Sequence, residues 1–179
     1  MKRIFVCVFL SVMANSVWSQ WSQKVLSKAF EQYKSLFVQK KMASLESIIM
    51  GDNFYLMDSI VNNSSEREIV KKRDKKMFYK KIHSLLDSTK MAKINFGDVS
   101  IVPHQGNNSF WGVSFHQAIV TAKDSLSGTM FILYELQDSP DDPRTSNYWE
   151  HEYFWQPDFI DGIPYPAESK ITLNDIFIP

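Results

Sequence analysis

The sequence predicts an α+β fold, with two long N-terminal helices packed on one face of a curved antiparallel sheet of four to five strands. Up to residue 89, apolar residues recur three and four positions apart, which is the period of an amphipathic helix. After residue 90 they alternate with polar residues, as in a strand with one buried face. Helices followed by a run of strands favour an arrangement in which the helices cover one side of the sheet.

The first helix is expected over residues 22–49, where neither glycine nor proline interrupts the apolar pattern. Gly51 follows it at the position of a helix C-cap. The second helix is expected over residues 66–89, because Ser65 and Glu68 have the spacing of a capping box. The many lysines in this second helix indicate a solvated face, and the alternative is an anionic surface or a glycan as the partner.

Four strands are expected in the second half of the chain, over residues 94–102, 110–121, 129–137 and 148–155. A possible bulge at Gly97 interrupts the first of them. Residues 54–57 are expected to form a short strand or an extended link, and residues 172–178 could add an edge strand. The acidic, proline-containing segment 138–143 is expected to connect two strands within one domain.

Length and composition indicate a single globular domain, residues 20–179, behind a signal peptide. The whole chain has 179 residues, of which 44% are hydrophobic and 22% are charged, as in ordinary globular proteins. The formal net charge is zero, which argues against nucleic acid as a partner. Aromatic residues reach 14%, which indicates a core or a cleft built from rings.

The first 19 residues have the pattern of a signal peptide. Lys2 and Arg3 precede an apolar run, residues 4–13, that is too short to span a membrane. Residues 17–19 approximate a small-x-small cleavage site, so the mature chain would begin at Gln20. We therefore expect export to the periplasm or the extracellular space, with no transmembrane segment after cleavage. The alternative is a short, buried first helix.

The strand over residues 110–121 sets the expected orientation of the other strands. If its apolar side faces the helices, three strands contribute alternate side chains to one inner face. This inner set is Trp111, Val113, Phe115, Gln117 and Ile119; Met130, Ile132, Tyr134 and Leu136; and Trp149, His151, Tyr153 and Trp155. It predicts an aromatic cleft whose candidate ligand-binding residues are Gln117, Tyr134, Trp149, His151, Tyr153 and Trp155. The alternative is a filled core whose polar groups are hydrogen-bonded.

No catalytic residue is assigned from the sequence. Acid–base catalysis needs a titratable group that faces the substrate, and Glu135, Glu150 and Glu152 are all expected on the outer face. A carboxylate could still come from the segment 52–58 or from Glu31 or Glu46 of the first helix, and on the strands His151 alone remains as a candidate base. The sequence therefore favours a non-catalytic domain, and an isomerase or hydrolase that uses His151 in the cleft is the alternative.

Neither a metal nor another cofactor is expected. His151 and Glu152 begin a His-Glu-x-x-His pattern, but the second histidine is missing and the segment is predicted to be a strand. The four histidines show no short ligand spacing. Cys7, the only cysteine, would leave with the signal peptide, so the mature chain would have no disulfide and no thiolate ligand.

The outer face of the predicted sheet carries more large apolar groups than a solvated sheet needs. We expect either an interface with a partner or coverage by the C-terminal segment or a loop. The candidate interface residues are Phe110, His116, Phe131, Leu133 and Phe154.

Three motifs carry a resemblance to a known family. They are Ile94-Asn95-Phe96 with Asp98-Val99 and Ile101-Val102, Phe110-Trp111-Gly112-Val113 with His116-Gln117, and Trp155-Gln156-Pro157 with Asp161-Gly162 and Pro164. Over residues 65–179 the chain resembles exported Bacteroidetes proteins, largely of unknown function, in the nuclear-transport-factor-two-like (cystatin-like) superfamily. Members commonly read Thr-Trp-Gln-Pro-Glu, and here Phe154 and Asp158 stand at the two ends of that motif.

The resemblance implies a cystatin-like roll, in which a curved sheet wraps around long helices. The superfamily includes enzymes, binding domains and dimerisation modules, so the fold implies no single function. Pairing through sheet faces is common in it, which favours a homodimer. We therefore expect an exported, non-catalytic domain that binds a small molecule or a protein partner through the aromatic cleft or the sheet face. A pure dimerisation or assembly module is a further alternative.

Overall fold

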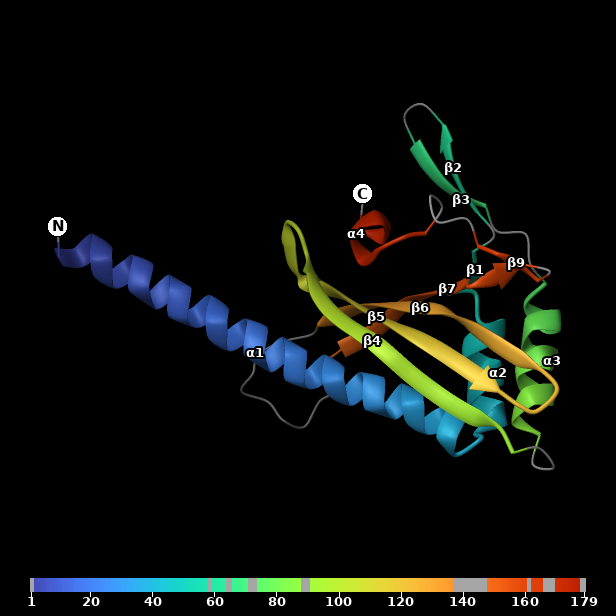
Figure 1. The fold of residues 1–179 in the computed structure, drawn as a ribbon. Helices are drawn as coiled ribbons and strands as arrows, with labels where there is room; N and C mark the ends of the chain where they lie inside the picture. Colours follow the sequence, from blue (N-terminus) through green and yellow to red (C-terminus); the bar gives the residue numbers. More distant parts are fainter. Residues whose placement is uncertain are drawn as a thin grey trace.

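The computed structural model describes residues 2–57, 59–63, 66–70, 74–87, 91–136, 148–160, 162–165 and 170–177, with backbone alone for 2–18, 59–63, 66–70, 160 and 174. Three helices lie on one side of a sheet (Figure 1), which confirms the predicted α+β class. The helices are α1 (Lys2–Val38), α2 (Met42–Met50) and α3 (Lys75–Leu86). Within the described part of the chain, no helix is both long and apolar enough to cross a membrane.

The main sheet has five strands in the order β1, β7, β6, β5, β4. Their bounds are Phe54–Leu56 (β1), Lys93–His104 (β4), Asn107–Val120 (β5), Ser125–Leu136 (β6) and Tyr148–Pro157 (β7). The long strands form an antiparallel meander, and the register shift after Gly97 confirms the predicted bulge. The fifth strand, β1, pairs parallel to β7, so the sheet is mixed rather than purely antiparallel.

The first predicted helix is two helices, α1 and α2, and the break lies at Lys40. Lys40 has a φ of 51°, and its amide bonds to the carbonyl of Phe37 at 3.0 Å. The amide of Lys41 bonds to the carbonyl of Leu36 at 2.8 Å, which completes a Schellman motif. Glycine usually occupies the left-handed position of this motif, so a lysine there gave no sequence signal for a helix end.

The second predicted helix begins too early in the sequence. Residues Glu66–Val70 form β3, which pairs with β2 (Ser59–Asn63) in a two-stranded hairpin that projects from the body (Figure 1). Helix α3 starts only at Lys75, where Asp74 caps it by accepting a hydrogen bond from the amide of Lys76 at 2.8 Å. Ser65, the expected cap, lies outside the described residues.

The C-terminal segment is a helix on the outer face rather than an edge strand. Thr172 and Asp175 form a capping box that starts α4 (Leu173–Ile176). A small hairpin, β8 (Phe159–Ile160) with β9 (Ile163–Pro164), precedes it.

The core lies between the helices and the inner face of the sheet, and Phe115 on β5 stands at its centre. Its ring centroid is 4.8 Å from that of Phe30 and 5.2 Å from that of Tyr33, both on α1. The inward orientation predicted for β5 and β6 is confirmed, because those side chains are buried in this cluster. A second cluster on the outer face joins the sheet to the C-terminal segment, and its buried members are Met57, Phe131, Phe154, Ile171 and Leu173.

Gly112 allows the C-terminal segment to approach the outer face of β5. A Cβ atom at this position would lie 2.5 Å from Leu173 and 2.8 Å from Phe177, closer than such atoms can pack. The absence of a side chain at Gly112 is therefore what lets α4 rest on the sheet.

We expect Gly112→Ala to lower the free energy of unfolding by about 1–3 kcal/mol, the cost of overpacking a filled site. Gly97→Ala is the matched control, because nothing lies within 4 Å of a Cβ at that position. Urea denaturation of both variants and of the double variant Gly112→Ala/Leu173→Ala measures the effect. Equal costs of Gly112→Ala with and without Leu173→Ala would contradict the proposed contact.

Candidate functional site

A β-bulge in β7 decides which of its side chains face the core. Leu133 pairs with Glu152, but the next residue of β6, Tyr134, pairs with Glu150, so His151 is an extra residue without a partner. Because strand side chains alternate, one inserted residue reverses the two faces of the strand on one side of the bulge.

The bulge corrects two expectations. Tyr153 and Trp155 face the core as predicted, but the predicted inward orientation of Trp149 and His151 is wrong. Trp149 is 57% exposed, and His151 is exposed and bonded to Glu135 on the outer face. The expectation that no carboxylate of the sheet faces inward is also wrong, because Glu150 accepts a hydrogen bond from the Tyr153 hydroxyl.

Three buried tyrosine hydroxyls lie around this inward carboxylate. Burial is the main cause that raises the pKa of Tyr33, Tyr134 and Tyr153 above the usual value, and the negative charge of Glu150 adds to it. These hydroxyls therefore stay neutral at ordinary pH. The Tyr33 hydroxyl donates to Oε1 of Gln117 at 3.3 Å, whereas the Tyr134 hydroxyl has no partner among the described residues.

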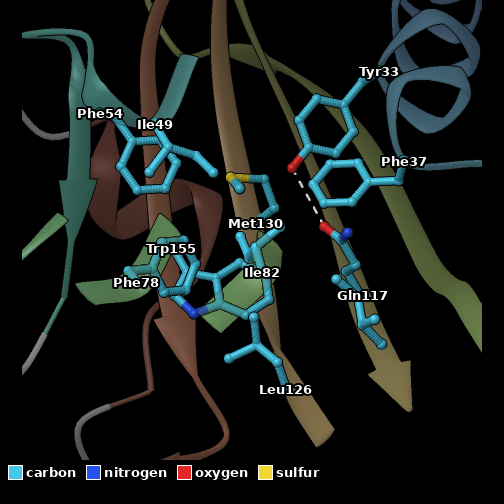
Figure 2. A pocket seen from close by; sticks show the side chains of 11 residues that line it. Tyr33, Phe37, Ile49, Phe54, Phe78, Ile82, Gln117, Leu126, Met130 and Trp155 are labelled. Atoms are coloured by element: carbon cyan, nitrogen blue, oxygen red, sulfur yellow. Dashed lines mark hydrogen bonds between the residues drawn. The ribbon is translucent and has the colours of Figure 1, made fainter. Parts of the chain in front are cut away.

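Figure 2 shows the inner cavity, which lies between α1, α2, α3 and the sheet. Its volume is about 10 Å³, which is room for one water molecule. Of the six residues predicted to bind a ligand in a cleft, Gln117 and Trp155 line it, from opposite sides in Figure 2. The other lining residues are Tyr33, Phe37, Ile49, Phe54, Phe78, Ile82, Ile119, Leu126 and Met130.

Two polar atoms in the wall of this cavity are buried without a partner in the described part of the chain, Nε2 of Gln117 and Nε1 of Trp155. Both are donors, so a water molecule could satisfy one of them. The interior is therefore closer to the filled core than to the open aromatic cleft that the sequence allowed.

The chain's own C-terminal segment covers much of the outer face. Phe131 and Phe154 are buried beneath it, and Leu133 packs against the same cluster. The amide of Ile171 donates to Oε1 of Gln156 at 3.3 Å, and the carbonyl of Phe177 bonds to Nε2 of His104 at 2.9 Å. Coverage by the C-terminal segment was the alternative to an interface at these positions.

The remaining interface candidates lie elsewhere on the outer face. His116 bonds through Nε2 to Oδ2 of Asp158 at 2.8 Å. Phe110 stays half-buried, and its ring centroid is 5.4 Å from that of His151. Phe110 therefore belongs to a second group of outward side chains, near the N-terminal end of β7.

We define the Trp149 surface as the outward side chains of Phe110, Glu135, Trp149 and His151. Phe110, Glu135 and Trp149 are neighbours across β5, β6 and β7 in the sheet register. Nε2 of His151 lies 2.7 Å from Oε2 of Glu135. The four side chains thus form one continuous patch on the outer face, and it includes the exposed indole of Trp149.

The spacing of aromatic residues along β7 is the sequence signal for this patch. Tyr148 packs against the core, and so do Tyr153 and Trp155. Tyr153 and Trp155 follow Tyr148 at an odd sequence spacing, five and seven positions later, so strict alternation cannot bring all three to one face. A bulge between them resolves the conflict, and it turns Trp149 and His151 outward.

Two histidines of the sheet each pair with one carboxylate. Among the described residues no group of three or more His, Cys, Asp and Glu side chains lies close enough to hold an ion. The two histidine–carboxylate pairs, His116 with Asp158 and His151 with Glu135, each supply two groups, whereas a protein zinc site usually has three or four ligands.

Comparison with known proteins assigns no family to the chain. No protein-family model matches it, and no curated protein is significantly similar in sequence. One similar solved structure is a chain of naphthalene 1,2-dioxygenase with indole bound in the active site. It is 11% identical, the match covers 82% of each chain, and the TM-score is 0.45. A similarity at this level assigns no function.

The buried tyrosines predict a loss of stability at alkaline pH. An unfolded tyrosine ionises near pH 10, whereas Tyr33, Tyr134 and Tyr153 keep their protons to higher pH when folded. The unfolded state then binds fewer protons, so stability is full below pH 10 and falls above it, by up to about 1.4 kcal/mol per pH unit for each tyrosine.

Tyr134→Phe removes one of these ionisable groups, so above pH 10 the free energy of unfolding should fall less steeply, by up to about 1.4 kcal/mol per pH unit. The Tyr134 hydroxyl has no partner among the described residues, so the substitution breaks no described hydrogen bond. Urea denaturation between pH 9 and pH 11 measures the two slopes. Parallel curves for the parent and the variant would show that Tyr134 ionises normally in the folded protein.

Proposed function

We propose that this protein is a non-catalytic binding domain that recognises its partner through the Trp149 surface. The observation that carries the proposal is the bulge at His151, which turns a large aromatic side chain out of the core and leaves it 57% exposed. Bulges are frequent beside functional sites, where they redirect side chains. Exposed tryptophans are also the residues most often found at the energetic centre of binding interfaces.

The interior supports this choice of surface over a buried pocket. A drug-sized ligand needs a pocket of roughly 300–1,000 Å³. The inner cavity that the described residues enclose measures about 10 Å³, so it has no room for such a ligand.

The placement of His151 supports a non-catalytic role. The alternative function was an isomerase or hydrolase with His151 as the base in an inner cleft. His151 instead lies on the outer face, and the described lining of the inner cavity contains neither a histidine nor a carboxylate. An acid or base that faces a bound substrate is what proton-transfer catalysis needs.

The proposal includes membership of the nuclear-transport-factor-two-like superfamily. Support comes from the motifs of the sequence and from the order of elements, in which helices precede a meander and cover one face of it. The fold by itself selects no function, so the binding role rests on the Trp149 surface.

We also propose export to the periplasm or the extracellular space. The described side chains of α1 pack against the core from Trp21 onward, one residue after the expected mature terminus at Gln20. The main support is the sequence pattern, in which Lys2 and Arg3 precede the apolar run 4–13 and the small-x-small site at 17–19.

The intact mass of the protein recovered outside the cytoplasm tests the export proposal. We expect a chain that begins at Gln20 and lacks 19 residues of the full sequence. A cytoplasmic protein that retains Met1 would overturn it.

A ligand-shift melting screen against metabolite, glycan and peptide libraries tests the binding proposal. A ligand at 100 times its dissociation constant adds about 2.7 kcal/mol of stability to the protein that binds it. We expect Trp149→Ala to abolish the shift, because the indole is the largest exposed group of the surface.

Leu126→Phe, which enlarges a side chain in the wall of the inner cavity, is the matched control and should keep the shift. The opposite result, a shift lost in Leu126→Phe and kept in Trp149→Ala, would place binding in the interior and overturn the proposal.

A further inference from the structure

The charges around the Trp149 surface indicate the kind of group that it binds. Two carboxylates share the outer face with the indole, Glu135 on β6 and Glu152 on β7. Their described partners are the uncharged hydroxyl of Tyr55, which donates to Glu152, and the imidazole of His151, which bonds to Glu135. None of the ion pairs between described residues brings a lysine or an arginine to this surface.

Resting on the binding function proposed above, we propose that the Trp149 surface binds an arginine side chain of a protein partner, with the guanidinium over the indole and paired with Glu135. Tryptophan is the aromatic residue that attracts cations most strongly over its ring face. A carboxylate beside the ring adds a charge-assisted hydrogen bond to the same cation.

The position of Glu135 suits this arrangement. Glu135 is the direct cross-strand neighbour of Trp149, and such neighbours have their Cβ atoms about 4.5–5.5 Å apart. The described hydrogen bond of Glu135 uses Oε2, so Oε1 is left to accept from a partner. A cation centred on the indole would then lie within reach of the carboxylate.

The surface disfavours other ligands for electrostatic reasons. An anion would meet the negative charge of Glu135. A purely apolar partner would remove water from that carboxylate without replacing its hydrogen bonds, which costs free energy. A cation meets neither penalty.

Arginine fits better than lysine because of its shape. Its planar guanidinium stacks on an aromatic face and presents a fork of donors to a carboxylate, whereas the lysine ammonium is a strongly hydrated point charge. On the outer side of a sheet, close to solvent, the more weakly hydrated cation is the easier one to bind.

Calorimetric titration of the protein with the peptide Gly-Arg-Gly-Arg-Gly tests the inference. The citrulline peptide of the same length is the matched probe, since citrulline keeps the shape of arginine and lacks its charge. We expect the arginine peptide to bind at least about fivefold more tightly, and its affinity to fall as salt is added.

Trp149→Ala and Glu135→Gln should each lower the affinity for the arginine peptide about fivefold, which corresponds to about 1 kcal/mol of binding free energy. Phe159→Ala and Glu46→Gln are the matched controls, because they remove an exposed aromatic ring and an exposed carboxylate elsewhere. Both controls should bind like the parent. Equal binding of the arginine and citrulline peptides, or an equal loss in the controls, would overturn the inference.

The test separates this inference from the function on which it rests. A neutral or anionic ligand whose melting shift disappears in Trp149→Ala would overturn the arginine assignment and leave the binding surface in place. A dimer in light scattering that Trp149→Ala converts to a monomer would make a second copy the occupant and would also overturn it. Ligand shifts that all survive Trp149→Ala would overturn both proposals.

Discussion

The packing of α1 on the central strand β5 is the constraint on which the rest of the structure depends. Phe30 and Tyr33 contact Phe115, and this contact turns every second side chain of β5 toward the helices. The intervening positions must then face outward. Gly112 is one of them, and α4 rests on it. One interaction therefore decides where the core lies and where the C-terminal segment docks.

The bulge at His151 frees one end of the sheet from this constraint. After the bulge, Tyr153 and Trp155 follow the alternation that β5 imposes. Before the bulge, Trp149 and Glu150 have the opposite orientation. The reversal brings a carboxylate to the buried tyrosine hydroxyls and sends an indole to solvent. A regular strand would do the opposite, burying the indole and exposing the carboxylate, as hydrophobic burial alone would favour.

The sequence was sufficient to predict the fold class and the orientation of β5 and β6, because apolar alternation in a half-buried strand is a strong signal. Prediction from the sequence failed where a structural motif contains a residue that does not usually mark it. Lys40 takes a position that glycine usually fills, so the end of α1 was missed. His151 is the extra residue of a β-bulge, and no particular residue type signals such a bulge in a sequence. The outward orientation of Trp149, which depends on the bulge, was therefore not predicted.

The edges of the sheet explain why a partner would use the sheet face. The edge strand β4 contains Pro103, which has no amide donor, and its register shifts after Gly97, where Asp98 has a φ of 52°. The opposite edge, β1, has three residues. The proline, the register shift and the short length of β1 each hinder the addition of a further strand at these edges. The C-terminal segment already occupies the centre of the outer face, so the Trp149 surface is a part of that face where a large aromatic group stays open to a partner.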